Sequence, residues 1–277
     1  MSIRIKTNII AQTVHKNLRK TSEKRFEQLE KLSSGKRINR AKDDTAGLSV
    51  AAKMDAQVRG LKMALKNAND GVSFVQTAEG GLHEISNILV RLRELTIQSA
   101  SDTIGQNERM SVEKEYQSLM SEIDRISEAT TFNGTNVING HGQGHLSFHV
   151  GASAGDENII LFDSDSANTS LEAIGIDGTT INSKNDAKGA ISDIDTAING
   201  VNSQRAELGA VQSRLHSTIN NIEIQTINHD KARSIIEDVD VADSSSKLIS
   251  ANILSQAGTA TLAQANMQPM SAMKLIK

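Results

Sequence analysis

The sequence lacks cysteine and tryptophan, and it contains one proline, one tyrosine and five phenylalanines among its 277 residues. Without cysteine there is no disulfide scaffold, no cysteine-ligated zinc, no iron–sulfur cluster and no cysteine nucleophile. The shortage of proline and aromatic residues argues against a large β-sandwich or barrel, because the turns and cores of those folds use both. A chain with so little proline can be helical over most of its length.

Charge is spread unevenly along the chain. Residues 1–66 carry 16 Lys and Arg against 6 Asp and Glu, although the formal net charge of the whole chain is -3. Such a segment is typical of an arm that binds nucleic acid or membrane, or of a surface that meets acidic surface in the same or a neighbouring copy. The basic stretch 16–42 has no recognisable nucleic-acid-binding fold, so we expect a solvated face or a contact between subunits, and no nucleic acid. No run of about 18 apolar residues is present, so we expect no membrane insertion, and residues 1–10 lack the apolar core of a signal peptide.

The dominant signal is an apolar stripe in alternating steps of three and four residues, which predicts long helices packed on one another. One stripe runs from Leu48 to Leu95 and predicts a helix over about 45–99, capped by Asp43, Asp44 or Thr45. Gly71, Gly80 and Gly81 interrupt it, and we expect a bend or break near residue 80. Further stripes run over 112–126 and 187–222, the latter with Arg205 and Gln212 on its seam.

Both ends of the chain have apolar stripes of the same kind, over 3–34 and 244–276. Neither end has a neighbouring domain in the sequence to bury its stripe. We therefore expect the two termini to pair with each other or with the termini of other copies. The residues expected to make these polymerisation contacts are Leu18, Leu29, Leu32, Leu248, Ile253, Leu254 and Leu262. Pro269 is expected to stop or kink the last helix.

The middle of the chain is rich in Gly, Asn, Ser and Thr. The runs 146–150 and 158–162 predict the two strands of a small, solvent-facing hairpin, joined through Gly151–Gly155. That joining segment matches the G-x-S-x-G pattern, but a nucleophile elbow needs a helix after it and an α/β sheet around it. His141, His145 and His149 are spaced like metal ligands on a helix, yet the glycines among them argue against a helix there. We therefore predict no catalytic, cofactor or metal site, and leave the role of these histidines open.

Motifs in the same order along the chain closely resemble those of bacterial flagellin. They include LSSGKRIN at 32–39, AKDDTAGL at 41–48, QTAEG at 76–80, RAELGA at 205–210 and LAQAN at 262–266. The resemblance implies a mainly α fold of long antiparallel, coiled-coil-like helices with one small β-hairpin region. It implies that 1–43 and 244–277 pair as the inner layer of a filament. Residues 44–243 would form a helical shaft domain, with the hairpin region at about 132–183.

The same resemblance implies a structural subunit rather than an enzyme. Such subunits leave through the flagellar type III export apparatus and self-assemble into the extracellular filament used for swimming. The implied partners are further copies of the chain, hook-associated junction and cap proteins, and a cytosolic export chaperone. Recognition of the monomer by the flagellin-sensing toll-like receptor would use the positions that match its activating pattern, Arg91, Leu95 and Glu115. In a filament the same positions would be buried as a contact between subunits. A hook–filament junction protein and a coiled-coil adaptor are the alternatives.

Overall fold

The computed structural model describes residues 7–140, 144–163 and 168–274. Its order is α1 (Ile9–Ser34), α2 (Thr45–Ser99), α3 (Gln106–Ala129), β1 (Thr131–Phe132), β2 (Thr135–Asn136), β3 (His145–His149), the short 3-10 helix η1 (Asp156–Asn158), β4 (Ile159–Asp163), α4 (Lys184–Glu237) and α5 (Val241–Lys274). The described residues are mainly helical, with two small antiparallel sheets, β1–β2 and β3–β4, which confirms the expected class.

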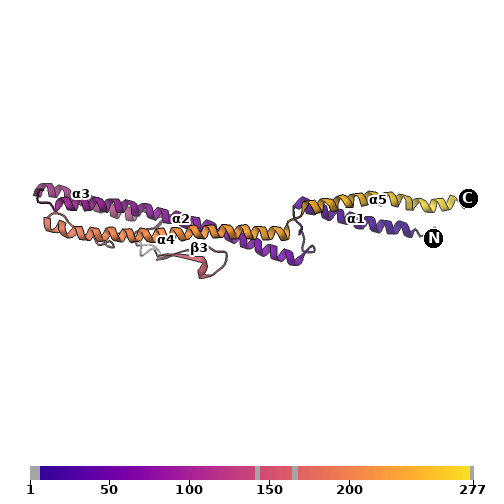
Figure 1. The fold of residues 1–277 in the computed structure, drawn as a ribbon, viewed down its shortest axis with the longest axis horizontal. Helices are drawn as coiled ribbons and strands as arrows, with labels where there is room; N and C mark the ends of the chain where they lie inside the picture. The colour runs from indigo at the N-terminus through magenta and orange to yellow at the C-terminus, as the bar shows by residue number, and fades with distance from the viewer. Residues whose placement is uncertain (1–6, 141–143, 164–167, 275–277) are drawn as a thin grey trace. The chain divides into compact units, whose positions relative to one another are not determined.

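The chain divides into two compact units, which are described separately. Unit 1 comprises Met1–Ala56 and Asn228–Lys277, and unit 2 comprises Gln57–Ile227. Unit 1 contains α1 and α5, which lie side by side (Figure 1). Unit 2 contains most of α2 and α4, all of α3 and both two-stranded sheets. The assignment of 1–43 with 244–277 to an inner filament layer stays a prediction.

The helix predicted over 45–99 is confirmed as α2, and its start follows from its capping residue. Asp44 Oδ1 accepts a hydrogen bond from the N–H of Gly47 at 2.8 Å, which satisfies one of the free donors of the first turn. Of the bend or break expected near residue 80, the break is wrong, because α2 continues through Gly80 and Gly81 to Ser99. A Cβ on Gly81 would lie 2.8 Å from Thr130 Oγ1 and 2.9 Å from Ile138 Cδ1. Gly81 therefore lets the chain after α3 lie close against α2.

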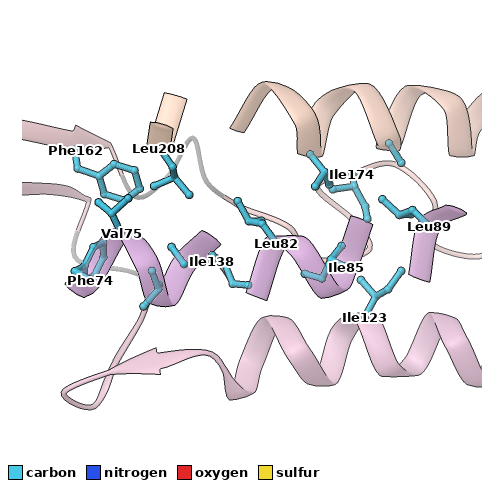
Figure 2. Close-up of a cluster of buried hydrophobic side chains, with 14 of the residues drawn as sticks. Phe74, Val75, Leu82, Ile85, Leu89, Ile123, Ile138, Phe162, Ile174 and Leu208 are labelled. Atoms are coloured by element: carbon cyan, nitrogen blue, oxygen red, sulfur yellow. The ribbon is translucent and has the colours of Figure 1, made fainter. Parts of the chain in front are cut away.

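The core of unit 2 is a continuous apolar cluster centred on α2. Leu82, Ile85 and Leu89 of α2 are fully buried, and Figure 2 shows them between side chains such as Ile123 of α3 and Ile174. The seam on α4 contributes Ala187, Ala190, Ile194, Ala197, Val201, Leu208, Leu215 and Ile222. The seam position Arg205 is half-buried rather than fully buried. Because these seams are aliphatic, unit 2 needs few aromatic residues.

The predicted hairpin is confirmed as β3 and β4, which pair antiparallel with Leu146 opposite Phe162 and Phe148 opposite Ile160. The hairpin faces solvent on one side only, where Ser147, His149 and Leu161 are exposed, whereas Ile160 and Phe162 are buried on the other side. The ring of Phe74 on α2 makes edge contacts with Phe162 at 5.7 Å and with Phe148 and Phe132 at 5.8 Å. Edge-to-face packing of this kind stabilises a pair by about 0.5–1.5 kcal/mol beyond burial, so the aromatic cluster attaches the hairpin to α2.

Polar groups join α3 to the segment before α4. The buried carboxylate of Glu113 accepts a hydrogen bond from the N–H of Ile181 at 2.7 Å. Tyr116, the sole tyrosine, is fully buried, and its hydroxyl shares a 2.7 Å hydrogen bond with Thr179. Burial raises the pKa of Tyr116 above 10.0. These contacts leave few buried polar atoms unpaired, so a glycine- and serine-rich segment can pack on an apolar core.

Candidate self-association surface

The pairing of α1 and α5 rests on one seam of small and apolar residues. Along α5 the seam follows alternating steps of four and three, through Ser244, Leu248, Ala251, Ser255, Gly258, Leu262 and Ala265, all buried or half-buried. The close approach is at Gly258, where a Cβ would lie 2.7 Å from Leu18 Cδ1. The pair is also joined at its end, because Asn8 caps α1 and its Nδ2 donates to the carbonyl of Ala265 at 2.8 Å. Each helix therefore buries one face only.

The residues predicted to make polymerisation contacts fall into two groups. Leu18, Leu32, Leu248 and Leu262 are half-buried in unit 1. Leu29, Ile253 and Leu254 are exposed, at 48%, 61% and 59%. An apolar stripe alone does not tell which of its members face the partner helix and which face solvent. The exposed group is available to other copies, and its role stays a prediction.

Further large apolar side chains of unit 1 are also exposed. They include Phe26 at 64%, Ile235 at 82%, Ile249 at 58% and Met267 at 62%. Ile235 and Ile249 were missed by the sequence reasoning because they lie outside the main stripes. Phe26 is the phenylalanine that lies outside the aromatic cluster, with the Arg25 guanidinium over its ring at 5.6 Å. Several large apolar side chains left exposed within one unit make it a candidate interaction surface for other chains.

The connections beside α1 and α5 pair with each other within unit 1. The backbone N–H of Arg37 donates to the carbonyl of Glu237 at 2.7 Å, and the N–H of Val239 donates to that of Gly35 at 3.0 Å. The Arg37 side chain donates to the carbonyl of Ile236 through Nε and Nη2, at 3.1 and 2.6 Å. These bonds satisfy backbone groups where α1 and α4 end, so the two connections are held in register.

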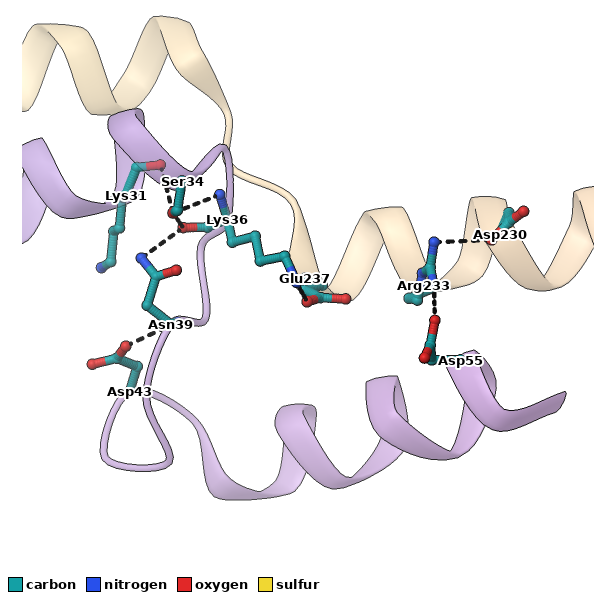
Figure 3. Close-up of polar contacts among 9 residues, drawn as sticks. All are labelled: Lys31, Ser34, Lys36, Asn39, Asp43, Asp55, Asp230, Arg233 and Glu237. Atoms are coloured by element: carbon teal, nitrogen blue, oxygen red, sulfur yellow. Dashed lines mark hydrogen bonds and ion pairs between the residues drawn. The ribbon is translucent and has the colours of Figure 1, made fainter. Parts of the chain in front are cut away.

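Ion pairs reinforce the same region (Figure 3). Lys36 pairs with Glu237, and Arg233 pairs with both Asp55 and Asp230. Asp43 accepts hydrogen bonds from the backbone N–H groups of Arg40 and Asn39, at 2.9 and 3.1 Å. The bond from Arg40 is the main reason why the pKa of Asp43 lies below 3.8. The loop between α1 and α2 is thus defined by specific polar contacts.

The three positions implied in receptor recognition lie in unit 2. Arg91 donates to Glu115 Oε1 through Nε at 3.1 Å and through Nη2 at 2.8 Å, and Nη1 donates to Glu94 at 3.0 Å. Hydrogen bonding to Glu115 is the main reason why the pKa of Arg91 is raised. Leu95 is 1% exposed and belongs to the apolar core of unit 2. The structure therefore places Arg91 and Glu115 together at the surface and Leu95 in the core.

The structure shows how the histidine pattern and the G-x-S-x-G segment are arranged. In the described parts of the chain, no three His, Cys, Asp or Glu side chains gather in a way that suits a metal ion. His141 and the side chain of His145 lie outside what the structure describes, and His149 is exposed on β3. Gly151–Gly155 leads into η1 and then β4 rather than into a long helix. No helix among the described residues has the length and hydropathy needed to cross a membrane.

Pro269 does not stop the last helix as expected, because α5 continues past it to Lys274.

Comparison with known proteins shows which family the chain resembles. The model of the bacterial flagellin N-terminal helical region matches residues 5–143, and that of the bacterial flagellin C-terminal helical region matches residues 191–276. A flagellin of Halalkalibacterium halodurans is 39% identical over 275 residues, which cover 99% of each chain. The flagellar filament 30.7 kDa core protein of Treponema maltophilum is 40% identical over 259 residues, 90% of each chain.

The solved structures agree with the sequence relatives. The crystal structure of Bacillus cereus flagellin superposes with a TM-score of 0.52 at 29% identity, over 57% of this chain and 88% of that chain. The matched family regions contain the two terminal helices, and the relatives match the chain nearly from end to end. The chain therefore belongs to the bacterial flagellin family.

Proposed function

We propose that this chain is the structural subunit of a bacterial flagellar filament, and that the exposed apolar faces of α1 and α5 are covered by other copies. The observation that carries the proposal is the set of large apolar side chains left open on the paired terminal helices, including Phe26, Ile249 and Ile253. A relative that is 40% identical is named a filament core protein. The role is mechanical, and it needs neither a catalytic residue nor a cofactor.

Self-assembly follows from how little each terminal helix buries within its own chain. An isolated helix is marginal in water, and α1 and α5 each pack against one partner helix. Burial by neighbouring copies supplies the missing stabilisation, at about 25 cal/mol for each Å² of apolar surface removed from water. Contacts between different faces of successive copies repeat without closing, which produces a filament rather than a ring.

The proposal extends to export and location. A chain without cysteine forms no disulfide on its way through a narrow channel, and this suits passage in an unfolded state through the flagellar type III export apparatus. The filament is extracellular. The partners at its ends are hook-associated junction and cap proteins, and a cytosolic export chaperone covers the apolar C-terminal helix before export. Arg91 and Glu115 are the surface groups available to the toll-like receptor.

Seeded polymerisation tests the proposal. The full chain and a truncation lacking 244–277 are mixed with short filament seeds and followed by electron microscopy. We expect long filaments from the full chain and none from the truncation. The near-UV circular dichroism of Tyr116, which reports on unit 2, should be the same in both. Normal filaments from the truncated chain would refute the role given to the terminal helices, and failure of the full chain to elongate seeds would favour a junction protein.

A further inference from the structure

Three asparagines of the chain are followed directly by glycine, namely Asn133, Asn139 and Asn199. Asparagine is one of the chemically labile side chains of proteins. A glycine after it has no Cβ, so the next backbone nitrogen is free to attack the carboxamide carbon of the asparagine and displace ammonia. The structure places the three pairs in different surroundings, and these surroundings decide which pair can react.

Asn133 and Gly134 are the two central residues of the turn between β1 and β2. Phe132 pairs with Thr135 across the turn. The φ angles of Asn133 and Gly134 are 50° and 79°, and a two-residue hairpin loop with both angles positive is a type I′ turn. Both residues are exposed. Neither the Asn133 carboxamide nor the Gly134 N–H has a hydrogen-bond partner among the residues that the structure describes. The electrophile and the nucleophile are therefore both free and in contact with water.

The other two pairs are protected in different ways. Asn139 is 6% exposed, and a Cβ on the next residue, Gly140, would lie 2.3 Å from Asn168 Nδ2, so this pair is crowded as well as buried. Asn199 is exposed but lies inside α4. Within a helix the N–H of Gly200 donates to the carbonyl four residues earlier, so an attack by this nitrogen first requires local opening of the helix.

We propose that Asn133 is a modification site, at which the side-chain amide is lost spontaneously to give aspartate and isoaspartate. The Gly134 nitrogen gives up its proton to water and attacks Cγ of Asn133. The bond from this nitrogen to Cγ forms, the bond from Cγ to Nδ2 breaks, and ammonia leaves a cyclic succinimide. One water molecule then opens the ring. Addition of water at Cγ gives aspartate, whereas addition at the main-chain carbonyl carbon gives isoaspartate, so the net reaction consumes one water and releases one ammonia.

The two products differ in their effect on unit 2. Isoaspartate adds one carbon atom to the backbone of a turn whose two strands are already held in place. The N–H of Val137 donates to the carbonyl of Thr130 at 3.2 Å, and the ring of Phe132 contacts that of Phe74 at 5.8 Å. The longer backbone disturbs the pairing of Phe132 with Thr135 between these contacts. Aspartate keeps the length of the turn and adds only a negative charge.

Ageing of the full chain, folded and in urea, tests the proposal. Samples are held at mildly alkaline pH, and mass spectrometry follows the loss of the amide in the peptides that contain Asn133, Asn139 and Asn199. An isoaspartate methyltransferase identifies isoaspartate. In the folded chain we expect Asn133 to react at least tenfold faster than either of the others. In urea the three rates should lie within threefold of one another, because the difference comes from the folded structure.

Two results of this measurement would overturn the proposal. One is an equal rate at Asn133 and Asn199 in the folded chain. The other is an Asn133 that stays intact in the folded chain but reacts in urea, because the turn would then protect it. The measurement requires no filament, so its outcome is independent of the proposed function.

The matched variants are Asn133→Gln and Asn133→Asp. The longer glutamine side chain closes the ring less readily, so methyl incorporation into the aged, folded Asn133→Gln chain should be at least fivefold lower than into wild type. Unchanged incorporation would place the modification elsewhere and contradict the proposal. Asn133→Asp supplies the charge without the extra backbone carbon. Hydrogen exchange of the segment 131–137 should be at least threefold faster in the isoaspartate form than in Asn133→Asp, and equal exchange would contradict the effect on the turn.

Discussion

Gly258 of α5 lies directly against Leu18 of α1, so that a Cβ at position 258 would come within 2.7 Å of Leu18 Cδ1. Position 258 is half-buried in the seam between the helices, and the positions that precede and follow it in the seam are Ser255 and Leu262. A small residue at this point sets how closely α1 and α5 approach. The terminal pair therefore depends on the absence of a side chain as well as on the apolar residues around it.

Replacing Gly258 with leucine should separate the two helices and weaken assembly. Overpacking of a close contact costs about 1–3 kcal/mol, and 2 kcal/mol corresponds to about a 30-fold change in an equilibrium constant. We expect Gly258→Leu to raise the critical concentration for polymerisation about 30-fold, measured by sedimentation of filaments. Thr259→Leu, at the next and exposed position, should change it less than threefold. Equal effects of the two substitutions would show that Gly258 is not a packing position.

Gly80 and Gly81 are adjacent in α2, and replacing each with alanine should change the free energy of unfolding in opposite directions. Nothing lies within 4 Å of a Cβ at Gly80, so Gly80→Ala should raise the free energy of unfolding by about 1 kcal/mol through helix propensity alone. At Gly81 a Cβ would meet Thr130 and Ile138, so Gly81→Ala should lower it by about 1 kcal/mol. Urea denaturation followed by far-UV circular dichroism measures both. Stabilisation by both substitutions would contradict the close packing at Gly81.

Gly80 and Gly81 also show where reasoning from the sequence reached its limit. Their low helix propensity predicts a break, but tertiary packing overrides propensity when a glycine admits a neighbouring segment, as Gly81 admits Ile138. The alternation in 146–150 correctly predicts a strand. It cannot show that Phe74, distant in sequence, gathers Phe132, Phe148 and Phe162 around it and so buries one face of the hairpin.

The sequence predicts which residues of α1 and α5 lie on apolar faces, but not which of those faces are covered. Periodicity places Leu18 and Leu254 on apolar stripes alike, because spacing reports a face of a helix and not what covers it. In the structure Leu18 contacts α5, whereas Leu254 is 59% exposed. The bonds from Arg37 to Ile236 and Glu237 join positions about two hundred residues apart, and no local pattern indicates them. The pairing of these distant segments is visible only in the structure.

Alkaline pH should destabilise unit 2 through Tyr116. Because the folded-state pKa of this buried phenol is raised, its contribution to stability is complete below the unfolded pKa of about 10. The contribution is lost as pH rises from there through the folded pKa, since the unfolded chain releases the proton first. We expect the melting temperature of wild type to fall more steeply than that of Tyr116→Phe between pH 9.5 and 11.5. Parallel curves for the two proteins would show that Tyr116 does not couple folding to pH.

A second ion pair of α2 serves as a control that distinguishes an effect of Arg91 on receptor recognition from an effect on stability. Arg93 pairs with Asp195 at 2.6 Å, and the two arginine side chains are 49% and 44% exposed. Exposed pairs contribute about 0–1 kcal/mol, so Arg91→Ala and Arg93→Ala should each cost less than 1 kcal/mol. In a reporter-cell assay with monomer, Arg91→Ala should lower the toll-like receptor response at least tenfold and Arg93→Ala less than twofold. An equal loss from both would contradict a specific role for Arg91.

Hydrogen exchange in monomer and filament tests the central claim most directly. If neighbouring copies cover the open faces of α1 and α5, the amides of these helices should exchange rapidly in the monomer and at least a hundredfold more slowly in the filament. The amides of α2 around the buried Leu82, Ile85 and Leu89 should be slow in both states. Mass spectrometry of peptides from the two states resolves these regions. Equal exchange of the α5 peptides in monomer and filament would contradict assembly through the terminal helices.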